Sequence, residues 1–393
     1  MLEKALTGSR SYWTWLAALV AAVAIGFAAW LVQLDAGLGV TGLGRDVSWG
    51  LYIAQFTFLV GIAASAVTVV LPYYLHDWKA FARITILGEL LAIAAVVTCG
   101  LFVLVDLGQP ARVLNVLLYP TPGSLMFWDM LSLGGYLVIN VVIAWATLSA
   151  ERSEVPVPGW TRPVIVLSIP WAISIHTVTA FLYAGLPGRS FWLTALLAPR
   201  FLASAFAAGP SLLILLALLL RRAARFDVGR DAIRKLSLIL TYTTIANLFF
   251  MLMELFTVFY SRVPEHMQHF QYLFVGLDGH RGLVPWMWTS VALTLVALAL
   301  LIVPRLRHDE RLLAGAAMAM FVALWIDKGL GLIVGGFVPT PLEDVVDYSP
   351  TAIEVMISAG IWAGGALLVT LFYKITIEVR QQVDAQAPAF PNA

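Results

Sequence analysis

Residues 84–105 read ITILGELLAIAAVVTCGLFVLV, and this stretch decides the class of the fold. A helix rises 1.5 Å per residue, so about 20 apolar residues cross the roughly 30 Å hydrocarbon core of a bilayer. Buried β-strands are much shorter than this. One carboxylate, that of Glu89, interrupts the run near its start. The stretch therefore predicts a transmembrane helix.

Nine more stretches share this length and character. The ten predicted spans are residues 13–34, 50–71, 84–105, 130–149, 164–184, 200–220, 236–259, 285–303, 312–336 and 355–375. The first is too long for the apolar core of a signal peptide, so we expect an uncleaved helix. The sequence predicts an all-α integral membrane protein, with residues 1–383 as one polytopic domain and residues 384–393 as a disordered tail.

Composition agrees with a membrane location and excludes several function classes. Hydrophobic residues make up 61% of the chain and charged residues 12%, against about 45–50% and 25% in soluble domains. A net charge of +1 provides no basic surface for binding nucleic acid. The single cysteine, Cys99, cannot form an intrachain disulfide, a zinc site or an iron–sulfur cluster. Any redox metal is therefore expected in a partner or in a haem held by histidines.

Basic residues orient the predicted spans. Of the 24 lysines and arginines, 17 flank the spans on the side of the N-terminus, six lie on the opposite side, and Lys328 lies within a span. The positive-inside rule then predicts cytoplasmic N- and C-termini in a bacterial inner membrane. The long connections 106–129 and 260–284 are expected on the opposite, periplasmic side. Four tryptophans on that side are expected in an interfacial aromatic belt: Trp49, Trp128, Trp192 and Trp286.

Polar side chains inside the spans are candidates for a functional or structural role, because a charge at mid-bilayer costs about 2.5–3.5 kcal/mol on insertion scales. His176 is the clearest case. Thr179 and Tyr183 follow it at i+3 and i+7, so all three share one face of the fifth predicted span. The functional reading is a binding or proton-transfer stripe that opens toward the periplasmic side. The structural reading is a histidine that hydrogen-bonds between helices.

Charged residues elsewhere in the spans form a weaker candidate proton path. Glu89, Glu254, Asp327 and Lys328 are its members. Asp327 and Lys328 are neighbours, and neighbours on a helix point about 100° apart, so at least one of them is expected to pair with another helix. Glu254 can equally be a carboxyl group that faces an adjacent helix.

Histidine placement disfavours haem. A b-type haem in a helix bundle usually needs two axial side chains, and His176 is the only histidine expected at membrane depth. The remaining five fall between the spans. Of these, the His266, His269 and His280 group is a minor alternative as a metal site. We predict no metal, haem or iron–sulfur cluster in this chain.

Several motifs resemble a known family. They are WGLY at 49–52, DLGQPAR at 106–112, SLMFWD at 124–129, HTVTA at 176–180, LPGR at 186–189 and APRF at 198–201. This pattern resembles the NrfD/PsrC family, the quinone-interacting membrane subunits of respiratory iron–sulfur complexes. Within that family it is most similar to DsrP- and HmeB-type subunits of sulfur-metabolising complexes.

The resemblance implies two four-helix bundles, formed by spans two to five and six to nine, with one further helix on either side. It also implies a quinone (menaquinone or ubiquinone) near the periplasmic end of the first bundle. Quinone chemistry needs an apolar slot, donors for two oxygens and a proton acceptor. We expect His176, Asp106 and Asp129 to act on the quinone. The residues expected to form its binding site are His176, Thr179, Tyr183, Tyr136, Trp128, Arg112 and Arg200. Of these, Arg112 and Arg200 are expected to hold the carboxylates in place.

Partners also follow from the resemblance. The expected partner is a periplasmic ferredoxin-like iron–sulfur subunit, with further subunits including a multihaem cytochrome c, a b-type cytochrome and a cytoplasmic iron–sulfur subunit. A membrane subunit of this kind transfers electrons but holds no catalytic centre of the reductase. Two other functions stay open: an ion or solute transporter that uses the intramembrane charges, and an inert membrane anchor.

Overall fold

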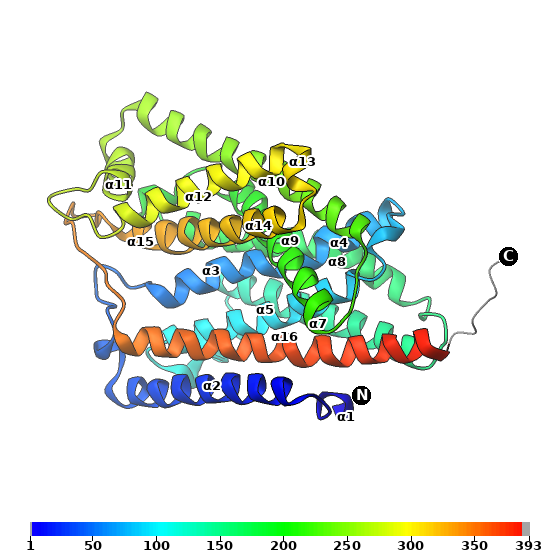
Figure 1. Cartoon of the computed structure of the whole chain (residues 1–393). Coiled ribbons are helices and arrows are strands. Elements are labelled where there is room, and N and C mark those ends of the chain that lie inside the picture. Colours follow the sequence, from blue (N-terminus) through cyan, green and yellow to red (C-terminus); the bar gives the residue numbers. More distant parts are fainter. Residues whose placement is uncertain (1, 387–393) are drawn as a thin grey trace.

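The computed structural model describes residues 2–386, and that part of the chain is helical and contains no strand (Figure 1). Within it, ten helical segments are long and apolar enough to cross a membrane, which confirms the predicted spans. They are α2 (Arg10–Ala36), α3 (Leu51–Ala63) with α4 (Ser65–Leu75), α5 (Thr85–Asp106), α7 (Leu125–Arg152), α8 (Thr161–Ala184), α9 (Leu197–Ala223), α10 (Arg230–Ser261), α12 (Val284–Ile302), α14 (Glu310–Leu324) with η5 (Trp325–Gly331) and α15 (Leu332–Phe337), and α16 (Ala352–Gln386).

Short helices fill the connections. They are α1 (Leu2–Ala5), η1 (Leu38–Val40), η2 (Lys79–Phe81), η3 (Pro110–Arg112), α6 (Asn115–Leu118), η4 (Ser190–Trp192), α11 (Pro264–Phe274) and α13 (Pro304–Arg307). The segment η5 is a π-helix. Such wider turns are rare and are frequently found at functional sites. Here the π-helix contains both charged residues of the ninth span, Asp327 and Lys328.

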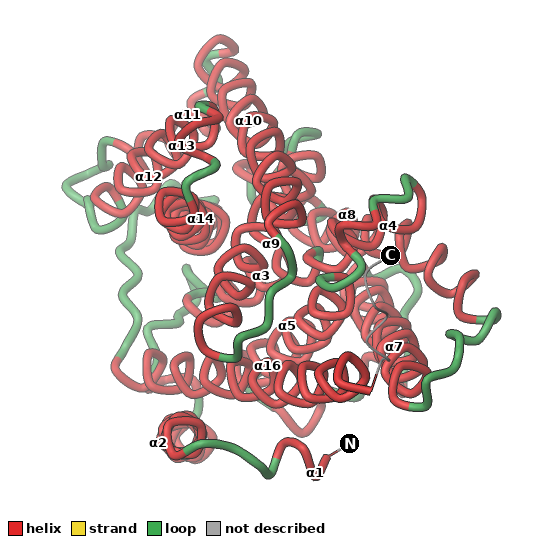
Figure 2. Tube along the Cα trace, turned by 45° about the vertical axis from the view of Figure 1, so that its right-hand side comes forward, coloured by secondary structure: helices red, strands yellow, loops and turns green. Residues whose placement is uncertain are grey.

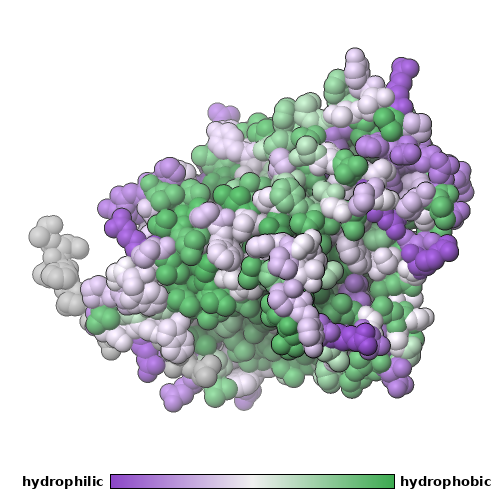
Figure 3. Space-filling view, turned by 180° about the vertical axis from the view of Figure 1, so that it is seen from behind, coloured by the Kyte–Doolittle hydropathy of each residue, from purple (hydrophilic) through white to green (hydrophobic). Residues whose placement is uncertain are grey.

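The surface has the distribution of side chains that a bilayer requires. Hydrophobic residues cover the middle of the face in Figure 3, and hydrophilic residues gather toward its two ends. Large apolar side chains are exposed on the helices, for example Trp145, Phe256 and Val138. Helices satisfy their backbone polar groups internally, so they are stable in such an environment. The chain is therefore a multi-pass integral membrane protein.

The second span forms the centre of the molecule. Its most apolar window, within Leu51–Leu75, is fully buried, because α3 packs against α5, α9 and η5 and α4 packs against α5, α8 and α9. Gly209 of α9 makes this approach possible, since a Cβ there would lie 2.9 Å from the Cα of Ser65. Helices contact one another within each expected set of four spans, that is, within spans two to five and within spans six to nine. Contacts of α9 with α3 and with α8 join the two sets.

The first and last spans pack together at one edge, where α2 lies beside α16 in Figures 1 and 2. Gly26 and Gly360 meet there, and a Cβ on Gly26 would lie 2.6 Å from the Cα of Gly360. This close approach agrees with the small-residue spacing of Gly360 and Gly364. The helix α1 and the C-terminal end of α16 lie at the same end of the bundle.

At three positions the structure adds to or differs from what the sequence predicts. Trp192, predicted for the interfacial aromatic belt, is fully buried inside the protein, where its indole Nε1 donates a 2.9 Å hydrogen bond to the Leu332 carbonyl oxygen. Arg200, predicted as the first residue of the span 200–220 and counted among the six basic residues of the periplasmic side, is buried within α9, which begins at Leu197. The helix α16 runs to Gln386, and the rest of the predicted disordered tail, residues 387–393, lies outside the described residues.

Candidate functional site

The predicted stripe on α8 lies wholly inside the protein. His176, Thr179 and Tyr183 are each 0% exposed. The period of the α-helix places them on one face, and that face packs against α3, α4, α7 and α9. The stripe is therefore enclosed by neighbouring spans and does not face lipid.

Asp129 meets this stripe from α7. The hydroxyl oxygen of Thr179 lies 2.6 Å from Oδ1 of Asp129 and 2.8 Å from the Ile175 carbonyl oxygen. A hydroxyl has one proton to donate, so both acceptors compete for it. Asp129 is itself buried. Two predicted site residues from different helices are thus in direct contact.

Tyr183 closes the far end of the stripe. Its hydroxyl lies 2.5 Å from Oγ1 of Thr57, and that oxygen lies 2.7 Å from the Ile53 carbonyl oxygen. Because the Thr57 proton is directed to Ile53, the Tyr183 hydroxyl donates to Thr57. The Tyr183 ring packs edge-on against Trp49 at 5.7 Å between centroids and lies 5.2 Å from Trp192. Sequence reasoning missed Thr57 as a member of the site.

His176 is the exceptional member of the stripe. Neither of its ring nitrogens has a hydrogen-bond partner among the described residues. A buried polar group left unsatisfied costs about 1–3 kcal/mol, and native proteins contain few of them. The structure therefore does not support the reading of His176 as a histidine that hydrogen-bonds between helices. The unpaired ring is suited to bind an external group.

The remaining residues predicted for the quinone site are spread more widely. Tyr136 is buried in α7 and donates a 3.3 Å hydrogen bond to the Ala63 carbonyl oxygen. Asp106 ends α5, and its Oδ1 is buried with no partner in the part of the chain that is described. Trp128 is 45% exposed and donates to the Pro122 carbonyl oxygen at 2.8 Å. Arg112 is exposed on η3.

Arg200 lies at the centre of a second buried polar cluster. One terminal nitrogen contacts Glu254 of α10, and the other lies 2.8 and 2.9 Å from the two carboxylate oxygens of Asp327. All three side chains are buried. We call Arg200, Glu254 and Asp327 the ion triad. Arg200 was expected to hold the carboxylates near the quinone, whereas its observed partners are these two carboxylates.

The four predicted proton-path residues separate into two regions. Asp327 and Glu254 belong to the ion triad. Beside it, the Lys328 ammonium donates a 3.3 Å hydrogen bond to the Phe201 carbonyl oxygen and lies 4.4 Å from the centre of the Phe201 ring. Glu89 is buried in the second turn of α5, and its charged neighbours include Arg380 and Glu151 of a different cluster. As predicted, Asp327 pairs with a different helix.

Two of the three histidines raised as a minor metal-site alternative have separate hydrogen-bond partners. Nδ1 of His269 lies 2.7 and 2.9 Å from the Gly335 and Val338 carbonyl oxygens, so it carries the proton, and Nε2 accepts from Ser190 at 3.0 Å. His280 contacts Asp347 at 2.7 Å. Among residues 2–386, no group of three or more His, Cys, Asp or Glu side chains could hold a metal ion.

Comparison with known proteins agrees with this architecture. The chain is 28% identical to a putative membrane subunit of the dimethyl sulfoxide reductase of Halobacterium salinarum, over 90% of this chain and 89% of that protein. It is 22% identical to a subunit of the selenate reductase of Mesobacillus selenatarsenatis, over 90% and 91%. It is 24% identical to the Hdr-like menaquinol oxidoreductase integral membrane subunit of Archaeoglobus fulgidus, over 88% of each chain.

All three relatives are named as subunits of oxidoreductases, two of them as membrane subunits, and they are similar to this chain over nearly its whole length. A family model described as "Polysulphide reductase, NrfD" matches residues 39–338, from the connection before α3 to the end of α15. It therefore includes both the α8 stripe and the ion triad. The chain belongs to the NrfD family of reductase membrane subunits.

Proposed function

We propose that this protein is the quinone-interacting subunit of a membrane electron-transfer complex of sulfur metabolism. It passes electrons between membrane quinol and an iron–sulfur partner subunit. The unpaired, fully buried ring of His176 is the observation that carries the proposal. The Archaeoglobus relative, named as a menaquinol oxidoreductase subunit, supports quinol as the electron donor.

The chemistry assigns distinct tasks to the residues of the first four-helix set. Oxidation of one quinol to quinone releases two protons and two electrons. The unprotonated ring nitrogen of His176 accepts a hydroxyl proton, since general-base help is the usual role of an imidazole. Asp129 and Asp106 receive protons on the periplasmic side. Thr179 and Tyr183 orient the headgroup, and the electrons pass to the iron–sulfur partner.

A quinol needs a path from the membrane to the His176 ring. Because the exposed fraction of His176 is 0%, the side chains around it must rearrange before a quinol hydroxyl reaches the ring. Trp49 packs edge-on against Tyr183 at the end of the stripe, and these two side chains are the ones that such a movement would displace. Trp128 and Tyr136 belong to the same proposed site on α7, and Arg112 lies at its periplasmic rim.

Orientation and partners complete the proposal. Both termini lie on the cytoplasmic side of the inner membrane, because 17 of 24 basic residues flank that end. A ferredoxin-like iron–sulfur subunit docks on the periplasmic connections, where α6 and α11 lie. A multihaem cytochrome c, a b-type cytochrome and a cytoplasmic iron–sulfur subunit are further proposed members of the complex.

The test is His176→Gln in the assembled complex. Glutamine keeps hydrogen bonding but does not accept a proton near neutral pH, so quinol oxidation should slow by about 10²–10⁴-fold. The complex should still assemble, because the native ring makes no bond with the rest of the described chain. The matched control is His269→Gln, a second buried histidine outside the proposed site, which should keep the wild-type rate. A wild-type rate for His176→Gln would remove His176 from the reaction.

A further inference from the structure

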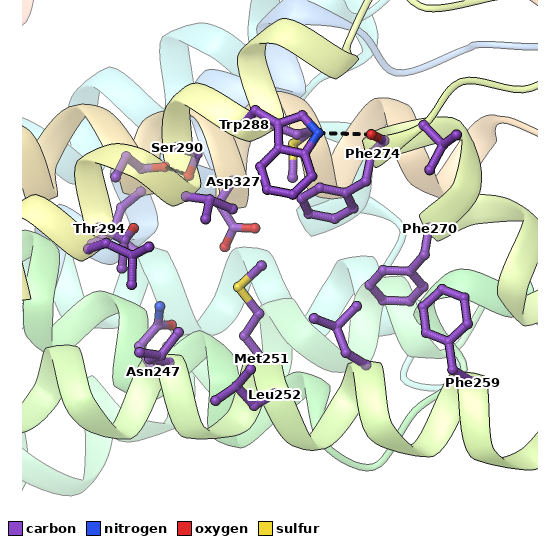
Figure 4. A pocket seen from close by; sticks show the side chains of 18 of the residues that line it. Asn247, Met251, Leu252, Phe259, Phe270, Phe274, Trp288, Ser290, Thr294 and Asp327 are labelled. Carbon is purple, nitrogen blue, oxygen red and sulfur yellow. Dashed lines mark hydrogen bonds between the residues drawn. The ribbon is translucent and has the colours of Figure 1, made fainter.

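A large cavity lies away from His176, in the second four-helix set. It has a volume of about 560 Å³ and is bounded by α10, α11, α12 and α14 (Figure 4). Small-molecule sites typically occupy about 300–1,000 Å³ and are mostly apolar with a few polar groups. Phe259, Val275 and Trp288 line it and are also exposed on the helix surface. The cavity therefore opens toward the lipid.

The inner end of this cavity is polar. Asn247 of α10 is 4% exposed, and within residues 2–386 nothing bonds its Oδ1. Figure 4 shows its amide group and the Asp327 carboxylate facing the same space. Arg200 fixes that carboxylate from the other side at 2.8 and 2.9 Å. The inner end of the apolar chamber thus holds an amide and a carboxylate that can both bond a polar group of a ligand.

Two aromatic side chains in the wall of the cavity contact each other. The Trp288 indole donates a 2.9 Å hydrogen bond to the Phe274 carbonyl oxygen, and the two rings meet edge-to-face at 5.8 Å. A flat ring can pack beside such side chains. Among the described residues that line the cavity, Asp327 is the only charged one. An anionic phospholipid headgroup would be repelled there, whereas a neutral hydroxyl group would be accepted.

We propose that this cavity is a second quinol-binding site, separate from the one at His176. A quinol hydroxyl donates to the Asp327 carboxylate, and the isoprenoid tail leaves through the lipid-facing mouth. The Asn247 amide also has donors for a quinone carbonyl, so the site holds both redox forms. The choice of quinol among neutral amphiphiles rests on the proposed function. The two polar side chains and the apolar chamber stand independently of it.

The experiment counts bound molecules of 2-heptyl-4-hydroxyquinoline N-oxide, a quinol analogue, on the full chain in nanodiscs. The wild type should bind two per chain. Asn247→Leu should weaken one site about tenfold, the loss expected for one hydrogen bond. Its fold should persist, because it removes an unsatisfied polar atom. Thr294→Phe, which fills the cavity from α12, should abolish the same site. Thr289→Phe, on the exposed side of α12, is the matched control and should retain both.

Each result has a distinct meaning. If the wild type binds one molecule and neither cavity variant changes this binding, the second site is overturned and the proposed function is kept. If the wild type binds one molecule and both cavity variants lose it, the cavity is supported as the quinol site and His176 is not the residue that binds the headgroup. Failure of the wild type to bind any would overturn both proposals. A wild type that binds two, with no change in either variant, would place the second molecule outside this cavity.

Discussion

Removing the central cation of the ion triad should destabilise the protein severely. In Arg200→Met, Glu254 and Asp327 would remain buried without the guanidinium that now contacts both. Breaking a buried ion pair by removing one partner costs about 3–5 kcal/mol, because the remaining charge is left uncompensated. Two carboxylates share this cation, so we expect the upper part of that range. At about 1.4 kcal/mol per factor of ten, the folding equilibrium would shift by roughly three orders of magnitude.

The assay is reversible unfolding of the purified chain in detergent, followed by circular dichroism. Arg45→Met is the matched control, since Arg45 pairs with Asp46 at 3.1 Å on the surface, where such pairs contribute about 0–1 kcal/mol. The triple variant Arg200→Met, Glu254→Gln and Asp327→Asn should recover most of the loss, because it leaves no buried charge. If Arg200→Met unfolds within about 1 kcal/mol of the wild type, the surface-pair range, the triad is not holding these helices together.

Three further outcomes are expected. Glu354→Gln should lose about 2–3 kcal/mol of unfolding free energy, measured as above, because the buried carboxylate accepts from Gly42 N, Thr351 N and the Tyr348 hydroxyl at 2.7–2.8 Å. Burial lowers the pKa of His269, so its contribution to stability is complete above the unfolded pKa near 6.5 and declines as pH falls below it. His269→Gln should flatten that acid-side slope in unfolding measured from pH 7.5 to 5.5. A reporter active only in the periplasm should be inactive after Val383 and active within residues 113–118, and the reverse pattern would invert the proposed orientation.

The spans were predictable because one property decides them. Crossing a bilayer requires about 20 apolar residues and satisfied backbone groups, and both requirements are readable from a single segment. Boundaries were less predictable. Arg200 marked the start of a span by its charge, yet α9 begins at Leu197. Only the carboxylates of α10 and η5 make a buried arginine stable there, and those partners lie 54 and 127 residues away.

The candidate site was predictable along one helix but not across helices. The helical period placed His176, Thr179 and Tyr183 on one face, and the structure agrees. The contact of Thr179 with Asp129 and the contact of Tyr183 with Thr57 depend on how three spans pack. No periodic signal in a single segment reports such packing. For the same reason Asn247 could not be singled out, because its unsatisfied oxygen is a property of its surroundings.

The two polar regions meet at consecutive residues of α9. Arg200 carries the ion triad, while the ring of Phe201 lies 5.8 Å from the Tyr183 ring and 4.4 Å from the Lys328 ammonium. Phe201 therefore stands between the α8 stripe and the charged residues of η5. A change in the position of the α9 N-terminus would move both regions together, because one helical turn carries the side chains that support each. This arrangement gives the APRF motif at 198–201 a physical reason: its arginine joins α9 to α10 and η5, and its phenylalanine contacts Tyr183 of α8.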